Sequence, residues 1–329
     1  MSEILNFQHW INRVYKSSKS GVYQTYEWIH AKELSGNNFI FLKDSEEHPS
    51  SGIFAFEESI ILPIIGKKKI LFAWGNPLAQ SEDQILKSLI EFKKVSKQYY
   101  YGTIMPPVVN PLNSLYEKAG YKKVDNYTVL IDLKKSEEEL WQNLEKKSAR
   151  WGVKTAEKNQ LIFGVPENKE EIEEFYELYK STAEKGNFKA EEKEFLIDLV
   201  DTKISKLFLI RHNNLIIGGG LLLIDLPNNY STLSLTSLSE EGKKLQAMPF
   251  LYWNLILYSK RLGLNYFDLG GYDKEAGQTE KTFQINKFKE RFGGQVVEQS
   301  IYATNSKYPR FRSILKQFRF LKGTYKKEK

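Results

Sequence analysis

Two hydrophobic spacings alternate through the first 133 residues and predict a mixed α/β unit. In Ser81–Tyr99, Ile85, Leu89, Phe92 and Val95 recur at steps of three and four, which is typical of a helix with one buried face. Asn113–Ala119 is a second, shorter helix that ends at Gly120. Short runs of β-branched and aromatic residues predict strands at Phe39–Leu42, Gly52–Phe56, Ser59–Ile65, Ile70–Trp74, Tyr100–Ile104 and Tyr127–Leu133.

From Lys134 onward the pattern changes to helix, helix, strand, strand, strand, helix, strand, helix, strand. Ser136 and Glu139 form a capping box at the start of the first helix, which we expect to continue through Trp151 to Lys158. The remaining predicted elements are helices at Lys169–Ala183, Glu191–Thr202, Pro249–Leu262 and Lys281–Phe292, and strands at Leu207–Arg211, Leu215–Ile224, Tyr230–Ser237, Asn265–Leu269 and Gln295–Tyr302. We therefore predict a second α/β unit over residues 134–305, of which the first unit is a rough copy.

Composition narrows the class of protein and sets the tail apart. The 329 residues are 41% hydrophobic and contain no cysteine, so disulfides and thiolate metal sites are excluded. The N-terminus lacks a signal-peptide pattern and no apolar run is long enough to span a bilayer, so we expect a soluble, cytoplasmic protein.

Net charge is +7, and nine Lys/Arg against one acid lie within residues 306–329, the basic tail. Aromatic residues alternate with these cations. The tail is predicted to contact RNA or the inner face of an anionic membrane, or else to be a solvated helix whose aromatic side chains pack on the body.

Two nearby segments carry the side chains best suited to chemistry. Tyr266–Tyr272 reads as a buried strand that ends in Asp268, Gly270 and Gly271. Burying a carboxylate at this position costs free energy, so Asp268 either has a functional role or accepts hydrogen bonds from the backbone N–H groups of the glycine turn. In Phe288–Gly294, Lys289 is either a functional cation or part of a solvated face over the aromatic pair Phe288 and Phe292.

Other candidate sites carry weaker signals. Lys147, Arg150, Lys154 and Lys158 form a basic stripe on the predicted helix, able to bind phosphate or simply to face solvent. The four histidines are scattered and show no metal-ligand spacing. Gly218, Gly219 and Gly220 lie inside a strand pattern, so we interpret them as a bulge or close packing and not as a dinucleotide site.

In order along the chain, these motifs resemble the FemA/FemB/FemX (FemAB) family of tandem GNAT-like domains. Gly21–Trp28 is similar to its Q-x-x-x-W segment, Leu140–Arg150 to W-x-x-x-x-K-x-x-R, Tyr266–Gly271 to Y-D-F-G-G with Leu269 in place of the aromatic, and Phe288–Gly294 to F-K-x-x-F-G-G. The resemblance spans nearly the whole chain and implies transfer of an amino acid from aminoacyl-tRNA to the stem-peptide amine of a peptidoglycan precursor, either lipid II or UDP-MurNAc-pentapeptide. It implies no metal or other cofactor. The candidate catalytic residues are Lys289 and Asp268, and the candidate substrate-binding residues are Arg291, Phe288, Lys147, Arg150, Gly270 and Gly271.

Two departures from the family pattern matter. The helical arm of long family members is absent, and Gln246–Leu251 lacks the glycines that hold the CoA pyrophosphate in acetyltransferases. Two alternatives stay open: a GNAT-type N-acyltransferase of an amino sugar in surface polysaccharide synthesis, and an RNA- or membrane-binding protein without turnover.

Overall fold

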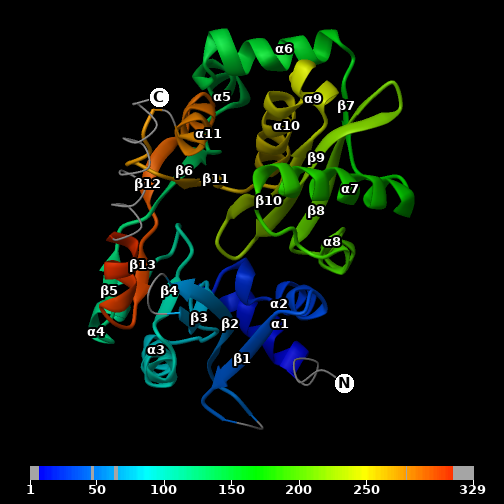
Figure 1. The fold of residues 1–329 in the computed structure, drawn as a ribbon. Coiled ribbons are helices and arrows are strands. Elements are labelled where there is room, and N and C mark those ends of the chain that lie inside the picture. Colours follow the sequence, from blue (N-terminus) through cyan, green and yellow to red (C-terminus); the bar gives the residue numbers. More distant parts are fainter. Residues whose placement is uncertain (1–6, 46–47, 63–65, 279, 314–329) are drawn as a thin grey trace. The chain divides into compact units, whose positions relative to one another are not determined.

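The computed structural model of the protein describes residues 7–45, 48–62, 66–278 and 280–313 (Figure 1). It divides into two compact units, each made from separate stretches of chain. The first unit comprises residues 1–127, 273–284 and 298–329, and the second comprises 128–272 and 285–297. None of the helices within the described ranges is long and apolar enough to cross a bilayer.

The first unit is built on a mixed sheet of six strands. In sheet order these are β1 (Asn38–Lys43), β2 (Gly52–Leu62), β3 (Gly66–Trp74), β4 (Gly102–Met105), β13 (Ile301–Ala303) and β5 (Lys122–Val124). All neighbours are antiparallel except β3 and β4. Its helices are α1 (Gln8–Ser17), η2 (Val22–Gln24), α2 (Tyr26–Leu34), α3 (Glu82–Val95), η3 (Ser96–Gln98) and α4 (Asn113–Lys118).

The second unit holds a seven-stranded sheet. Its order is β12 (Gln295–Glu298), β6 (Tyr127–Asp132), β11 (Tyr266–Tyr272), β10 (Tyr230–Leu238), β9 (Leu215–Asp225), β8 (Ser205–His212) and β7 (Ile162–Gly164). β10 and β11 are parallel, whereas β7 to β10 are successively antiparallel. Its helices are α5 (Glu137–Asn143), the π-helical turn η4 (Lys146–Arg150), α6 (Trp151–Lys158), α7 (Lys169–Gly186), α8 (Lys193–Leu199), α9 (Glu240–Lys244) and α10 (Ala247–Arg261), with α11 (Lys281–Glu290) shared between the units.

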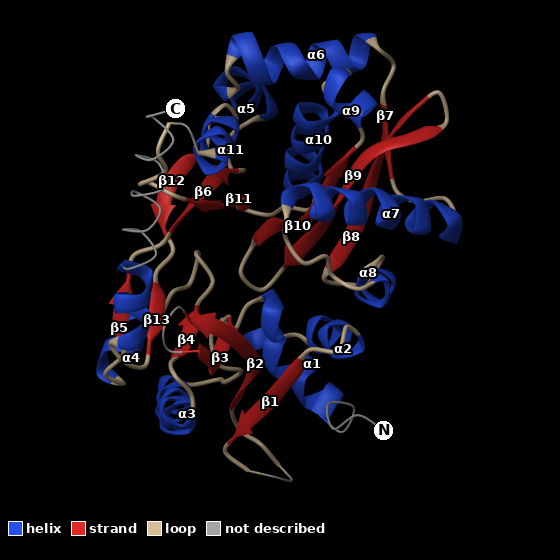
Figure 2. Ribbon diagram, viewed as in Figure 1, coloured by secondary structure: helices blue, strands red, loops and turns tan. Residues whose placement is uncertain are grey.

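Helices cover both faces of this second sheet (Figure 2). Leu222 and Ile224 of β9 belong to the same buried cluster as Leu251 of α10. Gly219 points the opposite way, where an added Cβ would lie 3.0 Å from the Phe175 ring of α7. The three glycines of β9 therefore serve close packing, one of the two interpretations that the sequence allows. The two mixed sheets confirm the predicted fold class of two α/β units.

The division of the chain differs from the expected boundaries at residues 133 and 305. β6, expected to close the first unit, pairs in the second sheet because Val129 and Ile131 are buried in its core. The single strand expected at Gln295–Tyr302 is two strands, β12 and β13, which lie in different sheets. In Figure 1, β13 lies between β4 and β5.

The helix expected through Trp151 is also interrupted. The predicted capping box at Ser136 and Glu139 is present, but α5 ends at Asn143 and Leu144 is extended. Of the basic tail, residues 307–313 are helical, and the rings of Tyr308 and Phe311 lie 5.1 and 6.3 Å from that of Tyr101. This packing agrees with one of the two interpretations of the tail, whose remaining residues 314–329 lie outside the described part.

Candidate functional site

Asp268 is buried near the carboxyl end of β11. It is 5% exposed, and its Oδ1 accepts hydrogen bonds from the Thr128 hydroxyl and, at 2.8 Å, from the Gly270 N–H. Gly270 has a φ of +80°, which favours glycine at this turn. Burial raises the pKa of Asp268, while the two hydrogen bonds and the charge of Lys289 act to lower it.

Lys289 reaches this strand end from α11. It is 9% exposed, and its Nζ donates a 2.6 Å hydrogen bond to the carbonyl of Gly271. A Cβ built on Gly270 would lie 3.6 Å from the same nitrogen. Burial lowers the pKa of Lys289, and the charge of Asp268 opposes that shift. The alternative of a solvated Lys289 is therefore wrong, and Lys289, Asp268, Gly270 and Gly271 form one cluster.

Gly293, shortly after α11, allows the chain to approach the end of α5 closely. Gly293 has a φ of +72°, and a Cβ there would lie 2.6 Å from the Asn143 carbonyl oxygen. Phe292 is 2% exposed and its ring lies 5.1 Å from that of Phe288. Phe288 and Phe292 thus share the inward face that the sequence predicts, and Lys289 points to a different side of the helix.

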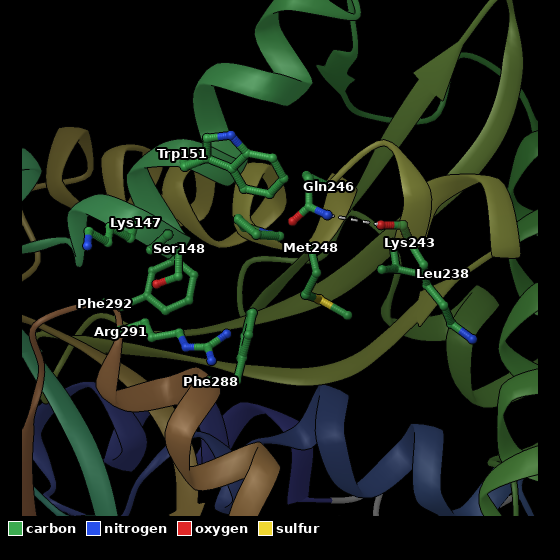
Figure 3. A pocket seen from close by; sticks show the side chains of 12 residues that line it. Lys147, Ser148, Trp151, Leu238, Lys243, Gln246, Met248, Phe288, Arg291 and Phe292 are labelled. Carbon is green, nitrogen blue, oxygen red and sulfur yellow. Dashed lines mark hydrogen bonds between the residues drawn. The ribbon is translucent and has the colours of Figure 1, made fainter.

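A pocket of about 460 Å³ lies beside that inward face of α11. In Figure 3, Trp151 lies on one side of it and Phe288 and Arg291 on the other. Its lining residues are Lys147, Ser148, Ala149, Trp151, Leu238, Lys243, Gln246, Met248, Pro249, Phe288, Arg291 and Phe292. None of these is acidic, and three are cationic, so the pocket favours an anionic ligand with apolar or aromatic parts.

A short network shapes the pocket wall at η4. The Glu145 carboxylate accepts one hydrogen bond from the Ser148 hydroxyl. It also forms an ion pair with Arg291, with 3.5 Å between Oε2 and Nε. The Glu145 N–H also donates to the Arg291 carbonyl at 2.8 Å. The N–H of Arg150 bonds to the Glu145 carbonyl, the five-residue step of a π-helical turn, which often occurs at functional sites.

The first turn of α10 forms another wall. Gln246 caps the helix in the left-handed conformation, and Pro249 packs so closely on α6 that a Cβ at Gly152 would lie 2.8 Å from the proline ring. Pro249 has no N–H to offer, so this helix start has one fewer amide for an anion.

The predicted site residues divide between these two places. Lys147, Phe288 and Arg291 line the pocket, whereas Arg150 lies in neither place, because its guanidinium donates 2.9 Å hydrogen bonds to the Leu144 carbonyl and the Gln142 side chain. The sequence interpretation missed Trp151, Lys243 and Met248 as pocket residues, and Thr128 as the partner of Asp268. The helix start at Gln246–Leu251 was a usable signal for Met248, but Thr128 gave none beyond strand alternation.

Comparisons with known proteins agree with this architecture. A model of the FemAB family matches residues 115–210. A crystal structure of FemX has a TM-score of 0.70 at 15% identity and covers 93% of this chain and 98% of its own. No curated protein sequence matches the chain.

Two further solved structures share this fold. The C-terminal domain of a putative lysylphosphatidylglycerol synthetase from Agrobacterium fabrum has a TM-score of 0.66 at 12% identity, with 95% of both chains covered. L-PGS from Bacillus licheniformis has a TM-score of 0.62 at 14% identity, with 94% and 95% covered. The resemblance expected from the motifs is thus confirmed: residues 115–210 match the model of the FemAB family, and the fold is like that of FemX.

Proposed function

We propose that this protein is an N-acyltransferase that moves an amino acid from aminoacyl-tRNA to the stem-peptide amine of a peptidoglycan precursor. The observation that carries the proposal is the buried ammonium of Lys289 at the end of β11, 2.6 Å from the Gly271 carbonyl. The FemAB match and the likeness to FemX support the class of reaction.

Lys289 stabilises the oxyanion in this mechanism. The neutral acceptor amine attacks the ester carbonyl, a C–N bond forms, and the ester C–O bond to the tRNA ribose breaks. The amine loses its proton and the ribose oxygen gains one, so no covalent enzyme intermediate is needed. An ammonium has three donors, and Gly271 takes one, which leaves others for the developing oxyanion. Asp268 holds the turn and opposes deprotonation of Lys289.

The pocket beside α11 suits the donor. Lys147, Lys243 and Arg291 supply positive charge for phosphates, and Trp151 and Phe288 supply surfaces on which bases can stack. Pro249 at the start of α10 and the absence of glycines in Gln246–Leu251 disfavour a CoA pyrophosphate there. The positive charge of the pocket and the lack of a pyrophosphate-binding start at α10 together favour tRNA over acetyl-CoA as the donor.

The test offers the purified protein labelled aminoacyl-tRNA or labelled acetyl-CoA with lipid II and UDP-MurNAc-pentapeptide. We expect label to move only from intact tRNA, with RNase abolishing the signal. Transfer from acetyl-CoA to an amino sugar would replace the proposal with the polysaccharide alternative. Transfer from neither donor, with tRNA binding retained, would favour a binding protein without turnover.

A second acceptor follows from the likeness to the lysylphosphatidylglycerol synthetase domain. The same assay therefore includes phosphatidylglycerol vesicles. Label in the lipid and none in the peptidoglycan precursors would keep the tRNA donor but assign the acceptor to a phospholipid headgroup.

A further inference from the structure

The β2–β3 hairpin of the first unit carries an exposed isoleucine close to three consecutive lysines. Ile61 is 83% exposed, the highest value for a large hydrophobic residue in the described ranges. β3 begins with Gly66 and continues as Lys67, Lys68 and Lys69. Residues 63–65 lie outside the described part, so this hairpin surface is defined by the two strands alone.

The strand register places these residues together. Ile61 pairs with Lys67 and Ser59 pairs with Lys69 in an antiparallel ladder. Directly opposed residues share a face and alternate residues return to it, so Ile61, Lys67 and Lys69 lie on one face. Lys68 pairs with Ile60 on the other.

The three lysines lie at the start of β3, and the two acids of β2 lie further along the ladder. None of the three lysines forms an ion pair with another residue that the structure describes. The two acidic residues of β2, Glu57 and Glu58, lie opposite Leu71 and Ile70, which are further along β3. The Glu57 carboxylate accepts a hydrogen bond from the Tyr99 hydroxyl.

An aromatic residue and a fourth cation extend the surface. The Tyr100 N–H donates a 2.8 Å hydrogen bond to the Lys69 carbonyl. Nζ of Lys307, the first cation of the basic tail, lies 4.9 Å from the Tyr100 ring. Tyrosine and lysine both place an apolar body beside a polar tip, which suits the boundary between lipid and water.

We propose that the hairpin surface docks on an anionic phospholipid bilayer. Ile61 enters the interfacial layer while Lys67 and Lys69 on its own face, together with Lys307, meet the phosphate headgroups, and Lys68 adds positive charge from the other face. The charge alone would suit RNA as well, but an isoleucine this exposed gains free energy only by leaving water, and a bilayer supplies that environment next to negative charge. The proposal does not depend on the acyl transfer proposed above.

The first test uses the absence of cysteine in the chain. Ile61→Cys in the full chain is labelled with a nitrobenzoxadiazole dye and mixed with phosphatidylcholine vesicles with or without phosphatidylglycerol. Leu215→Cys, at a 59% exposed position of β9, is the matched control. We expect blue-shifted emission at position 61 with phosphatidylglycerol vesicles only, and none at 215. Unchanged emission at 61, or an equal shift at both positions, would overturn the proposal.

The second test separates local from overall charge. Lys67, Lys68 and Lys69 are changed together to Gln, and a control variant changes the exposed Lys169, Lys185 and Lys203 instead. Cosedimentation with phosphatidylglycerol vesicles should weaken roughly a hundredfold in the hairpin variant, on a scale of about 1 kcal/mol per lysine. An equal loss in both variants would overturn the docking surface. So would a hairpin variant that loses tRNA binding but keeps vesicle binding.

Discussion

At the residue scale, Lys289 should be indispensable for turnover. Loss of one oxyanion donor costs about 10²–10³ in kcat in other acyl transfers, so we expect a fall of that order in Lys289→Ala with a small change in KM. Lys287→Ala is the matched control, because Lys287 is exposed two residues away and pairs with Glu290. Steady-state kinetics with aminoacyl-tRNA measures both. Equal activity in the two variants would remove Lys289 from the mechanism.

The buried carboxyl of Asp268 should leave a signature in the pH dependence of stability. Burial raises its pKa above the ordinary 3.8, so the folded state binds more protons than the unfolded state just above that pH. Its contribution to stability is present below pH 3.8 and is lost as the pH rises through the folded pKa.

Asp268→Asn keeps a carbonyl oxygen for the Gly270 N–H and removes the titration. We therefore expect the free energy of unfolding of the variant to fall less than that of the wild type as pH rises above 3.8. Urea unfolding across a pH series measures the difference between the two proteins, in which the other carboxyls cancel. Parallel curves would show that the Asp268 carboxyl does not titrate abnormally.

At the scale of elements, the end of α11 depends on a close approach of backbones. Gly293→Ala should destabilise the protein by more than about 1 kcal/mol, since the alanine takes a positive φ and its Cβ meets the Asn143 carbonyl. Gly263→Ala is the control: it has a φ of +76° and no atom within 4 Å of an added Cβ. Urea unfolding measures the stability of both variants. Equal destabilisation would mean that the end of α5 shifts to make room for the added methyl group at position 293.

Individual elements were largely predictable, but their interruptions were not. The spacing of apolar residues located α3, and the capping box located the start of α5. The helices expected at Lys169–Ala183 and Pro249–Leu262 correspond to α7 and α10. Nothing in the sequence marks the break after Asn143, because it is stabilised from elsewhere: the Glu145 N–H bonds to the Arg291 carbonyl. The same limit applies to the site. Asp268 and Lys289 were proposed from their residue types and lie together in the structure, whereas the guanidinium of Arg150 is hydrogen-bonded to the Leu144 carbonyl at the end of α5.

At the scale of the whole molecule, each unit has its own buried cluster, and the first is completed by a strand from near the C-terminus. Chain order alone assigns β13 to the second unit, which directly precedes it in the sequence. The strands with which β13 pairs are instead determined by packing against residues far away in the sequence. Tyr302 of β13 shows what decides it. Its fully buried ring stacks on Tyr116 at 4.2 Å, and its hydroxyl donates to Asn113 at 2.7 Å.

Tyr302→Ala should therefore destabilise the first unit, by about 3–5 kcal/mol for loss of a large buried aromatic side chain. Hydrogen exchange should speed up in β4 and β5, which flank β13, and stay unchanged in β8 to β10 of the second unit. Phe175→Ala, at a fully buried position of α7, is the reciprocal control and should affect the second unit instead. If either substitution accelerates exchange in both sheets equally, the two units unfold as one cooperative body and the division into separate cores carries no energetic meaning.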